Sequence, residues 1–190
     1  LSPCQAALVN GSAAHALDYD DVLRPLHGHP TAAVLPVVLA LGEKLGIGGK
    51  GIIAAFVAGV EVAARVGAMM GEKHYEKGWH ATGTVGTFGA AAAAARMMGL
   101  DAETTAQCFG IAATQAAGLK SMFGTECKPL HAGKAAMNGI IAAELASRGF
   151  SARSDVLECK LGFADTQTDS YMPDQALDGL GELFHTLDVK

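Results

Sequence analysis

The stretch "GTVGTFGAAAAAARMMGLD", residues 83–101, decides the fold. It is built from small and apolar residues without proline, which is typical of a helix. Its six alanines at 90–95 predict a close approach of two helices, because only Ala or Gly lets two helix backbones come so near. At its end, Gly99 takes the left-handed conformation, Leu100 folds back onto the last turn, and Asp101 is expected to cap a following helix.

The same kind of joint occurs at two other places in the chain. "KLGI" at 44–47 and "SRGFS" at 147–151 each place a glycine at a helix end with an apolar residue directly after it. Ser151 stands where a cap would start another helical segment. Repeated joints of this kind predict antiparallel helical hairpins, and hence an all-α fold class.

Apolar residues recur at three- and four-residue spacings over most of the chain, as expected for helices. Only the first of these segments contains a proline, Pro36. After residue 150 the sequence becomes more polar, which favours short helices and loops, and the final "HTLDVK" resembles the start of a strand. We therefore expect one helical domain over residues 1–190, less regular from about 151. The predicted helices cover residues 31–45, about 50–70, 83–98, 102–117 and 131–148.

Composition argues against several classes of protein. The net charge is −5 and Lys and Arg form no stripe, so a nucleic-acid partner is not expected. The longest apolar stretches are too short, or too rich in Gly and Thr, to span a bilayer, so no membrane partner is expected either. The four cysteines are widely spaced and form no CxxC or His/Cys metal pattern, which predicts reduced thiols and a cytoplasmic location. They are Cys4, Cys108, Cys127 and Cys159.

Charged and titratable residues gather between the helices in three polar islands, residues 18–30, 72–86 and 121–136. The second island places His80, and the third places Lys128, just ahead of a helix. Helix N-termini carry partial positive charge and free N–H groups, so they bind anions. If the islands converge, they form a cationic pocket suited to a small polycarboxylate.

The first island, "DYDDVLRPLHGHP", is compatible with a metal site, an acid–base site or a solvated loop. Spacing i, i+2, i+3 cannot place all three aspartates on one helical face, and no second acidic motif completes an oxygen shell, which weakens the metal interpretation. "DYDD" also matches the DxDD acid motif of some terpene cyclases, but 6% aromatic residues do not supply the cavity for that chemistry. A carboxylate that caps a helix and another that orients His27 or His29 is the favoured interpretation.

Three further histidines, His15, His74 and His185, are isolated in the sequence. For each of them, a helix cap or a solvated side chain is expected rather than a part in catalysis. His131 belongs to the third polar island and, like Lys128, leads into a helix.

Five separated motifs together resemble the MmgE/PrpD family, in order from about residue 5 to 150. The resemblance implies a large all-α domain with a smaller α+β lid domain, a homodimer, and an active site between the two domains. It also implies acid–base chemistry on small polycarboxylates. The motifs are "LVNGSAAHALDYDDV", "HGHPTAAVLPVVLALGE", "GWHATGTVGTFGAAAAAARMMGLD", "GIAATQAAGL" and "GTECKPLHAGKAAMNGIIAAELASRGF".

The resemblance carries four site residues onto this chain. Asp18 matches an active-site aspartate, His29 a pocket histidine, His80 a histidine that acts directly in acid–base chemistry, and Lys128 a lysine that meets a substrate carboxylate. Many members have Thr where this chain has Val22, which predicts a missing contact to a substrate hydroxyl. No metal or organic cofactor is implied. The residues that the lid contributes have no counterpart here, so the chain is expected to be a fragment that covers most of the helical domain and lacks the lid.

Three functions remain open from the sequence. The first is a lyase that dehydrates 2-methylcitrate or decarboxylates cis-aconitate, with His80 and Asp18 in acid–base chemistry and His29 and Lys128 binding carboxylates. The second is an epimerase or racemase of an imino- or amino-dicarboxylate. The third is a catalytically incomplete helical dimerisation scaffold.

Overall fold

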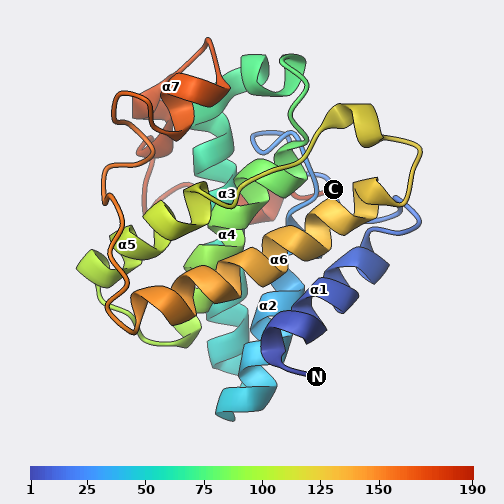
Figure 1. Ribbon diagram of the computed structural model, residues 1–190, viewed down its shortest axis with the longest axis vertical. Helices are drawn as coiled ribbons and strands as arrows, with labels where there is room; N and C mark the ends of the chain where they lie inside the picture. The colour runs from blue at the N-terminus through green and yellow to red at the C-terminus, as the bar shows by residue number, and fades with distance from the viewer.

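The computed structural model describes residues 1–190 and contains helices and no strands, which confirms the all-α fold class (Figure 1). All five predicted helices form, as α2 to α6. Helix α1 was not predicted, although Ser2 and Gln5 form a capping box in front of it and Pro3 opens it. The elements are α1 (Pro3–Ala14), α2 (Pro30–Leu45), α3 (Gly49–Glu76), α4 (Ala81–Met97), α5 (Ala102–Ala113), η1 (Lys120–Met122), α6 (Cys127–Ala146), α7 (Phe163–Gln167), η2 (Pro173–Ala176) and η3 (His185–Asp188).

Helix α4 lies at the centre of the domain and packs against α2, α3, α5 and α6. Small residues make these crossings possible. A Cβ atom added to Gly139 of α6 would lie 2.5 Å from the carbonyl carbon of Ala90, and one added to Gly89 would lie 2.7 Å from the carbonyl oxygen of Gly59 in α3. The close approach predicted from the alanine run is therefore confirmed, and it accounts for a helix that is buried on every side.

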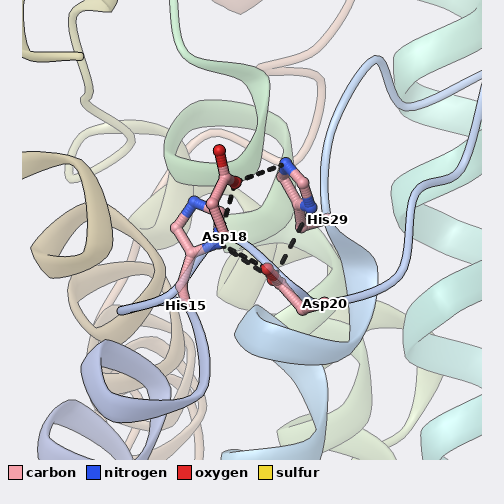
Figure 2. Close-up of side chains that lie close together, drawn as sticks. All are labelled: His15, Asp18, Asp20 and His29. Atoms are coloured by element: carbon pink, nitrogen blue, oxygen red, sulfur yellow. Dashed lines mark hydrogen bonds and ion pairs between the residues drawn. The ribbon is translucent and has the colours of Figure 1, made fainter. Parts of the chain in front are cut away.

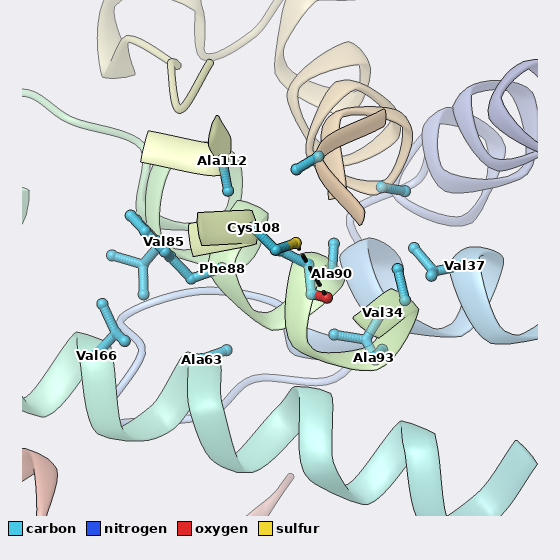
Figure 3. Packing of buried hydrophobic residues seen from close by; sticks show 14 of the residues in the cluster. Val34, Val37, Ala63, Val66, Val85, Phe88, Ala90, Ala93, Cys108 and Ala112 are labelled. Atoms are coloured by element: carbon cyan, nitrogen blue, oxygen red, sulfur yellow. Dashed lines mark hydrogen bonds between the residues drawn. The ribbon is translucent and has the colours of Figure 1, made fainter. Parts of the chain in front are cut away.

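The larger apolar side chains pack around α4 (Figure 3). Phe88 is fully buried and meets Phe109 and Phe163 edge-on, with ring centroids 6.1 and 4.8 Å apart. Cys108 lies in the same core, and burial raises the pKa of its thiol to about 12. No two of the four cysteines are bonded to each other.

The three helix joints have the predicted geometry. Gly46, Gly99 and Gly149 adopt φ angles of 67°, 68° and 81°. In each joint, the N–H of the following residue donates to a carbonyl five residues back, which is the 6→1 bond of the Schellman motif. Asp101 accepts a hydrogen bond from the Thr104 N–H at 2.8 Å and caps α5, as predicted.

The prediction that Ser151 starts another helical segment is wrong, because the next helix begins only at Phe163. Tertiary contacts hold the chain open here. The Ala152 N–H donates to the Gln107 side chain at 2.6 Å, and the backbone passes so close to Gly110 that a Cβ there would lie 2.4 Å from the Arg153 oxygen. The chain therefore crosses α5 in an extended form that a helix could not adopt.

Helix α3 is long and apolar enough to cross a membrane by length and composition, with a mean hydropathy of 1.8 over its best window, although the sequence predicted no such stretch. Half of that window is buried inside the domain, where α3 packs against α2 and α4. Its apolar composition is thus accounted for by core packing.

The last forty residues are mostly turns and are bonded to α3. Helix α3 bends at Gly71, where φ is 64°, and the freed Met70 carbonyl accepts the Thr168 hydroxyl at 2.7 Å. Further on, the Arg65 guanidinium donates to the carbonyls of Asp178 and Leu183 at 2.8 and 2.9 Å. These tertiary hydrogen bonds satisfy backbone carbonyls that have no partner within a helix.

The prediction of a strand at "HTLDVK" is wrong, because His185–Asp188 forms the 3₁₀ turn η3. Lys190 nevertheless pairs with Val22 through two backbone hydrogen bonds of 2.7 and 3.1 Å. This pairing places the last residue beside the first polar island.

Candidate functional site

Each polar island contains the start of a helix. His29 is the N-cap residue of α2, His80 is the N-cap residue of α4, and Lys128 is the second residue of α6. Neither histidine uses its side chain to cap its helix, so both imidazoles are available for other contacts. The arrangement directs three partly positive helix N-termini toward one region.

Close backbone contacts hold the first and second islands together. Gly28 lies so near the first turn of α4 that a Cβ there would be 2.7 Å from the Thr82 hydroxyl oxygen. The same hydroxyl accepts a hydrogen bond from the His29 N–H at 3.1 Å. A side chain at position 28 would therefore push the two islands apart.

The third island joins them through the segment before η1. The His80 N–H donates to the Gly118 carbonyl at 3.0 Å. Gly118 and Gly83 both lie against His131, since a Cβ at either position would come within 3.3 Å of that side chain. All three polar islands therefore converge on one site.

His29 and two aspartates of the first island form a cluster with His15, which ends α1 (Figure 2). His15, the C-cap residue of α1, places Nδ1 2.9 and 3.0 Å from the two carboxylate oxygens of Asp20. His29 places Nε2 3.6 Å from Oδ1 of Asp18 and donates from Nδ1 to the Asp21 carbonyl at 2.9 Å. One half of the favoured interpretation is confirmed, because the Asp21 carboxylate accepts hydrogen bonds from Thr31 in the first turn of α2. The histidine that is hydrogen-bonded by another carboxylate is His15, and not His27 or His29.

Both clustered carboxylates are held in the ionised form. Asp18 bonds the Lys128 ammonium, and this hydrogen bond is the main reason why the pKa of Asp18 is lowered. Burial opposes ionisation of Asp20, but the hydrogen bond from His15 and the charges of His15 and His29 outweigh it, so the pKa of Asp20 is lowered as well. The site thus contains two carboxylates, each with a cationic or hydrogen-bonding partner.

A pair of histidines, His80 and His131, joins the second and third islands. Nδ1 of His80 lies 2.9 Å from Nδ1 of His131, so one nitrogen donates and the other accepts. Burial, followed by the charge of His131, lowers the pKa of His80 to about 3, and burial also lowers the pKa of His131. Phe123 packs edge-on against His80 with ring centroids 4.9 Å apart, and Lys128 lies over the Phe123 ring. His80 is therefore neutral at pH 7 in the unliganded chain.

His15 belongs to the first cluster and also lies close to the pair formed by His80 and His131. Its ring centroid is 4.6 Å from that of His29 and 5.7 Å from that of His80. Its side chain is fully buried, and its Nε2 atom has no hydrogen-bond partner. A cavity of about 400 Å³ opens beside it and is also lined by Asp18, Lys128 and the loop at 124–126.

The four side chains His15, Asp18, Asp20 and His29 place ligand atoms within 4.8 Å of one another. Mixed imidazole and carboxylate sets of this size can hold a divalent cation. In this arrangement the Lys128 ammonium already supplies a positive charge to Asp18. The absence of a metal from the functional site stays a prediction.

Sequence reasoning missed the importance of two histidines. His15 and His74 were expected to be caps or solvated. His15 is the C-cap residue of α1, but neither side chain is solvated, since the two residues are only 1% and 2% exposed. His74 is a structural core residue, bonded through Nε2 to the Thr84 hydroxyl at 2.7 Å and through Nδ1 to the Gln167 carbonyl at 3.1 Å. His15 is the centre of the site, and its position three residues before Asp18 was the one available signal.

Comparison with known proteins gives a consistent result. A family model described as the MmgE/PrpD N-terminal domain matches residues 1–176. Human cis-aconitate decarboxylase is 39% identical over 168 residues, which cover 86% of this chain and 35% of that protein. Cis-aconitate decarboxylase of Aspergillus terreus is 31% identical over 204 aligned positions, which cover all of this chain and 42% of that protein. The chain thus spans 35–42% of the length of these relatives.

Proposed function

The chain belongs to the MmgE/PrpD family, and we propose that it contributes the helical side of a lyase site for a small di- or tricarboxylate. Decarboxylation of cis-aconitate is the reaction we favour, because the relatives named above carry that activity in their names. The observation that carries the proposal is that Lys128 lines a cavity with Asp18, and that Asp18 lies between Lys128 and His29, at the place where the three polar islands meet. An epimerase within the same family has no observation in its favour.

Lys128 and His29 are the proposed carboxylate-binding residues. Their ammonium and imidazolium groups make charge-assisted hydrogen bonds, which are about twice as strong as neutral ones. In the unliganded chain the Lys128 ammonium forms an ion pair with the Asp18 carboxylate. A substrate carboxylate of the same charge can take this place, which leaves Asp18 to orient His29 at its present distance of 3.6 Å.

His80 is the proposed acid–base residue, with Asp18 in the same chemistry and no metal or organic cofactor. Burial, followed by the charges of neighbouring imidazoles and Lys128, lowers its pKa to about 3. A bound polycarboxylate adds negative charge nearby, which raises the pKa of an imidazole toward neutral pH. Substrate binding would thus prepare His80 for proton transfer.

The proposed reaction needs one proton donor. The bond between carbon and the departing carboxylate breaks, and its electron pair forms a new double bond to the neighbouring carbon. The electrons of the original double bond then take a proton at the carbon beside a remaining carboxylate. Carbon dioxide and an unsaturated dicarboxylate are the products. Assembly as a homodimer and a cytoplasmic location remain predictions.

Substitution of His80 tests the proposal. We expect His80→Ala in the full-length protein to lower kcat/KM for cis-aconitate by about 10²–10⁴-fold, the usual contribution of a positioned acid–base group. Turnover of 2-methylcitrate, measured in parallel, distinguishes decarboxylation from dehydration. His185→Ala, half-buried in η3 and remote from the site in sequence, serves as a control. Activity of His80→Ala within a few-fold of this control would contradict the proposal.

A further inference from the structure

The buried Nε2 atom of His15 has no hydrogen-bond partner, although almost all buried polar atoms have one. We propose that His15, held by Asp20, is a further catalytic residue that delivers a proton from Nε2 to the substrate carbon. This inference rests on the proposed function and assigns the delivery of the proton to the substrate carbon to His15 instead of His80.

Asp20 fixes the proton on one side of the ring. Its two carboxylate oxygens lie 2.9 and 3.0 Å from Nδ1 of His15, and its side chain is only 10% exposed. A carboxylate oxygen accepts, so Nδ1 carries the proton and the neutral ring has its lone pair on Nε2. Figure 2 shows Nε2 on the side of the ring away from Asp20. The pair therefore presents a defined nitrogen, as an aspartate–histidine pair does in other enzymes.

The two buried rings have different partners. Nδ1 of His15 lies at hydrogen-bond distance from the Asp20 carboxylate, whose pKa is lowered. Nδ1 of His80 lies at the same distance from the His131 ring, and burial lowers the pKa of His80 to about 3. Of the two buried rings, His15 is the one with a carboxylate partner.

The ion pair between Asp18 and Lys128 lies beside His15. All three residues line the same cavity, and Oδ1 of Asp18 lies 4.0 Å from Nδ1 of His15, whose side chain is buried. A substrate carboxylate that binds Lys128 competes with Asp18 at this place. The proposal requires that the substrate then reaches the unpartnered Nε2 atom.

The proton transfer is balanced. As carbon dioxide leaves, the electrons of the original double bond take the proton from Nε2 of the His15 imidazolium. His15 becomes neutral, keeps its Nδ1–H bond to Asp20, and recovers a proton from solvent before the next turnover. No oxidant, reductant or metal takes part in this step.

Three variants of the full-length protein test the role of His15. His15→Asn keeps a donor for Asp20 but removes Nε2, and we expect kcat/KM for cis-aconitate to fall by about 10²–10⁴-fold. His74→Asn alters a buried histidine that bonds Gln167 and Thr84, and we expect its activity to stay within a few-fold of wild type. Binding of propane-1,2,3-tricarboxylate, a saturated analogue, should stay within about threefold of wild type in both variants when measured by calorimetry.

Asp20→Asn provides a measurement, the pH profile of kcat/KM, that would not change if His15 had only a structural role. Without the carboxylate, the imidazolium loses its proton at lower pH, so the alkaline limb of the kcat/KM profile should move down by about one pH unit or more. This variant also decides the outcome if His15→Asn does not fold.

Two results would overturn the inference alone. In the first, wild type is active and His15→Asn is as active as His74→Asn. In the second, the pH profile of Asp20→Asn superimposes on that of wild type. A wild-type protein that turns over neither cis-aconitate nor 2-methylcitrate would overturn the proposed function and this inference together.

Discussion

Two buried histidines lie side by side in the site, yet their hydrogen-bond partners differ in kind. His15 faces the Asp20 carboxylate and His80 faces the His131 ring, while the rings of His15 and His80 are only 5.7 Å apart. Both side chains are almost completely buried. The comparison teaches that two equally buried imidazoles in one site can have partners of different kinds at 2.9 Å, a carboxylate for His15 and a second imidazole for His80.

The largest effect should appear in acid stability. His80 and His74 lack a carboxylate partner, and burial lowers their pKa values to about 3 and about 4 from an unperturbed 6.5. Between those values the unfolded chain binds more protons than the folded chain, so stability falls as the pH falls below 6.5. We expect each histidine to contribute a loss of roughly 2 kcal/mol between pH 7.5 and pH 5.

Urea unfolding at several pH values measures this loss. Asp18 and Asp20, whose pKa values are lowered, stay ionised in the folded chain over this range and add little to the slope. His74→Asn should remove the His74 share of the pH dependence, roughly 2 kcal/mol. Equal slopes in wild type and variant would contradict the assignment of His74 as a neutral core histidine.

The second prediction exchanges the partner of one pair. His131→Asp gives His80 a carboxylate in place of an imidazole, at a position where the two rings now meet at 2.9 Å. An opposite charge at this distance should raise the pKa of His80 by about two units. Titration of the His80 ring by NMR measures the change, with His131→Asn as the uncharged control. An equal shift in both variants would show that relief of burial, and not charge, moves the value.

Much of the fold could be predicted from sequence because its signals are local. The Gly46, Gly99 and Gly149 joints and the Asp101 cap are each encoded within a few residues, and all four form. The failures came where tertiary contacts replace local preference. Ser151 starts no helix because the chain is bonded to Gln107 of α5.

The site divides in the same way. Asp18, His29, His80 and Lys128 follow from motifs, and the structure brings them to one place, although their roles stay proposals. The links between them join residues far apart in the chain, such as Lys128 with Asp18 and His131 with His80. No periodicity reports such pairs. His15 was missed because a single histidine at the end of a helix is indistinguishable by sequence from a solvated one.

The third prediction has the smallest effect and bears on the central claim, that the three polar islands form one polycarboxylate site. Lys128→Met keeps the length of the side chain and removes the charge that bonds Asp18. Losing one charge-assisted hydrogen bond should weaken binding of propane-1,2,3-tricarboxylate by about 10- to 100-fold. The control is Lys73→Met, which alters an exposed lysine paired with Glu76 and should bind like wild type.

Isothermal titration calorimetry of this analogue with wild type, Lys128→Met and Lys73→Met is the most direct measurement. The account predicts binding by wild type and Lys73→Met and an affinity lower by about 10- to 100-fold in Lys128→Met. Equal affinity in all three proteins, or no binding by wild type, would contradict it.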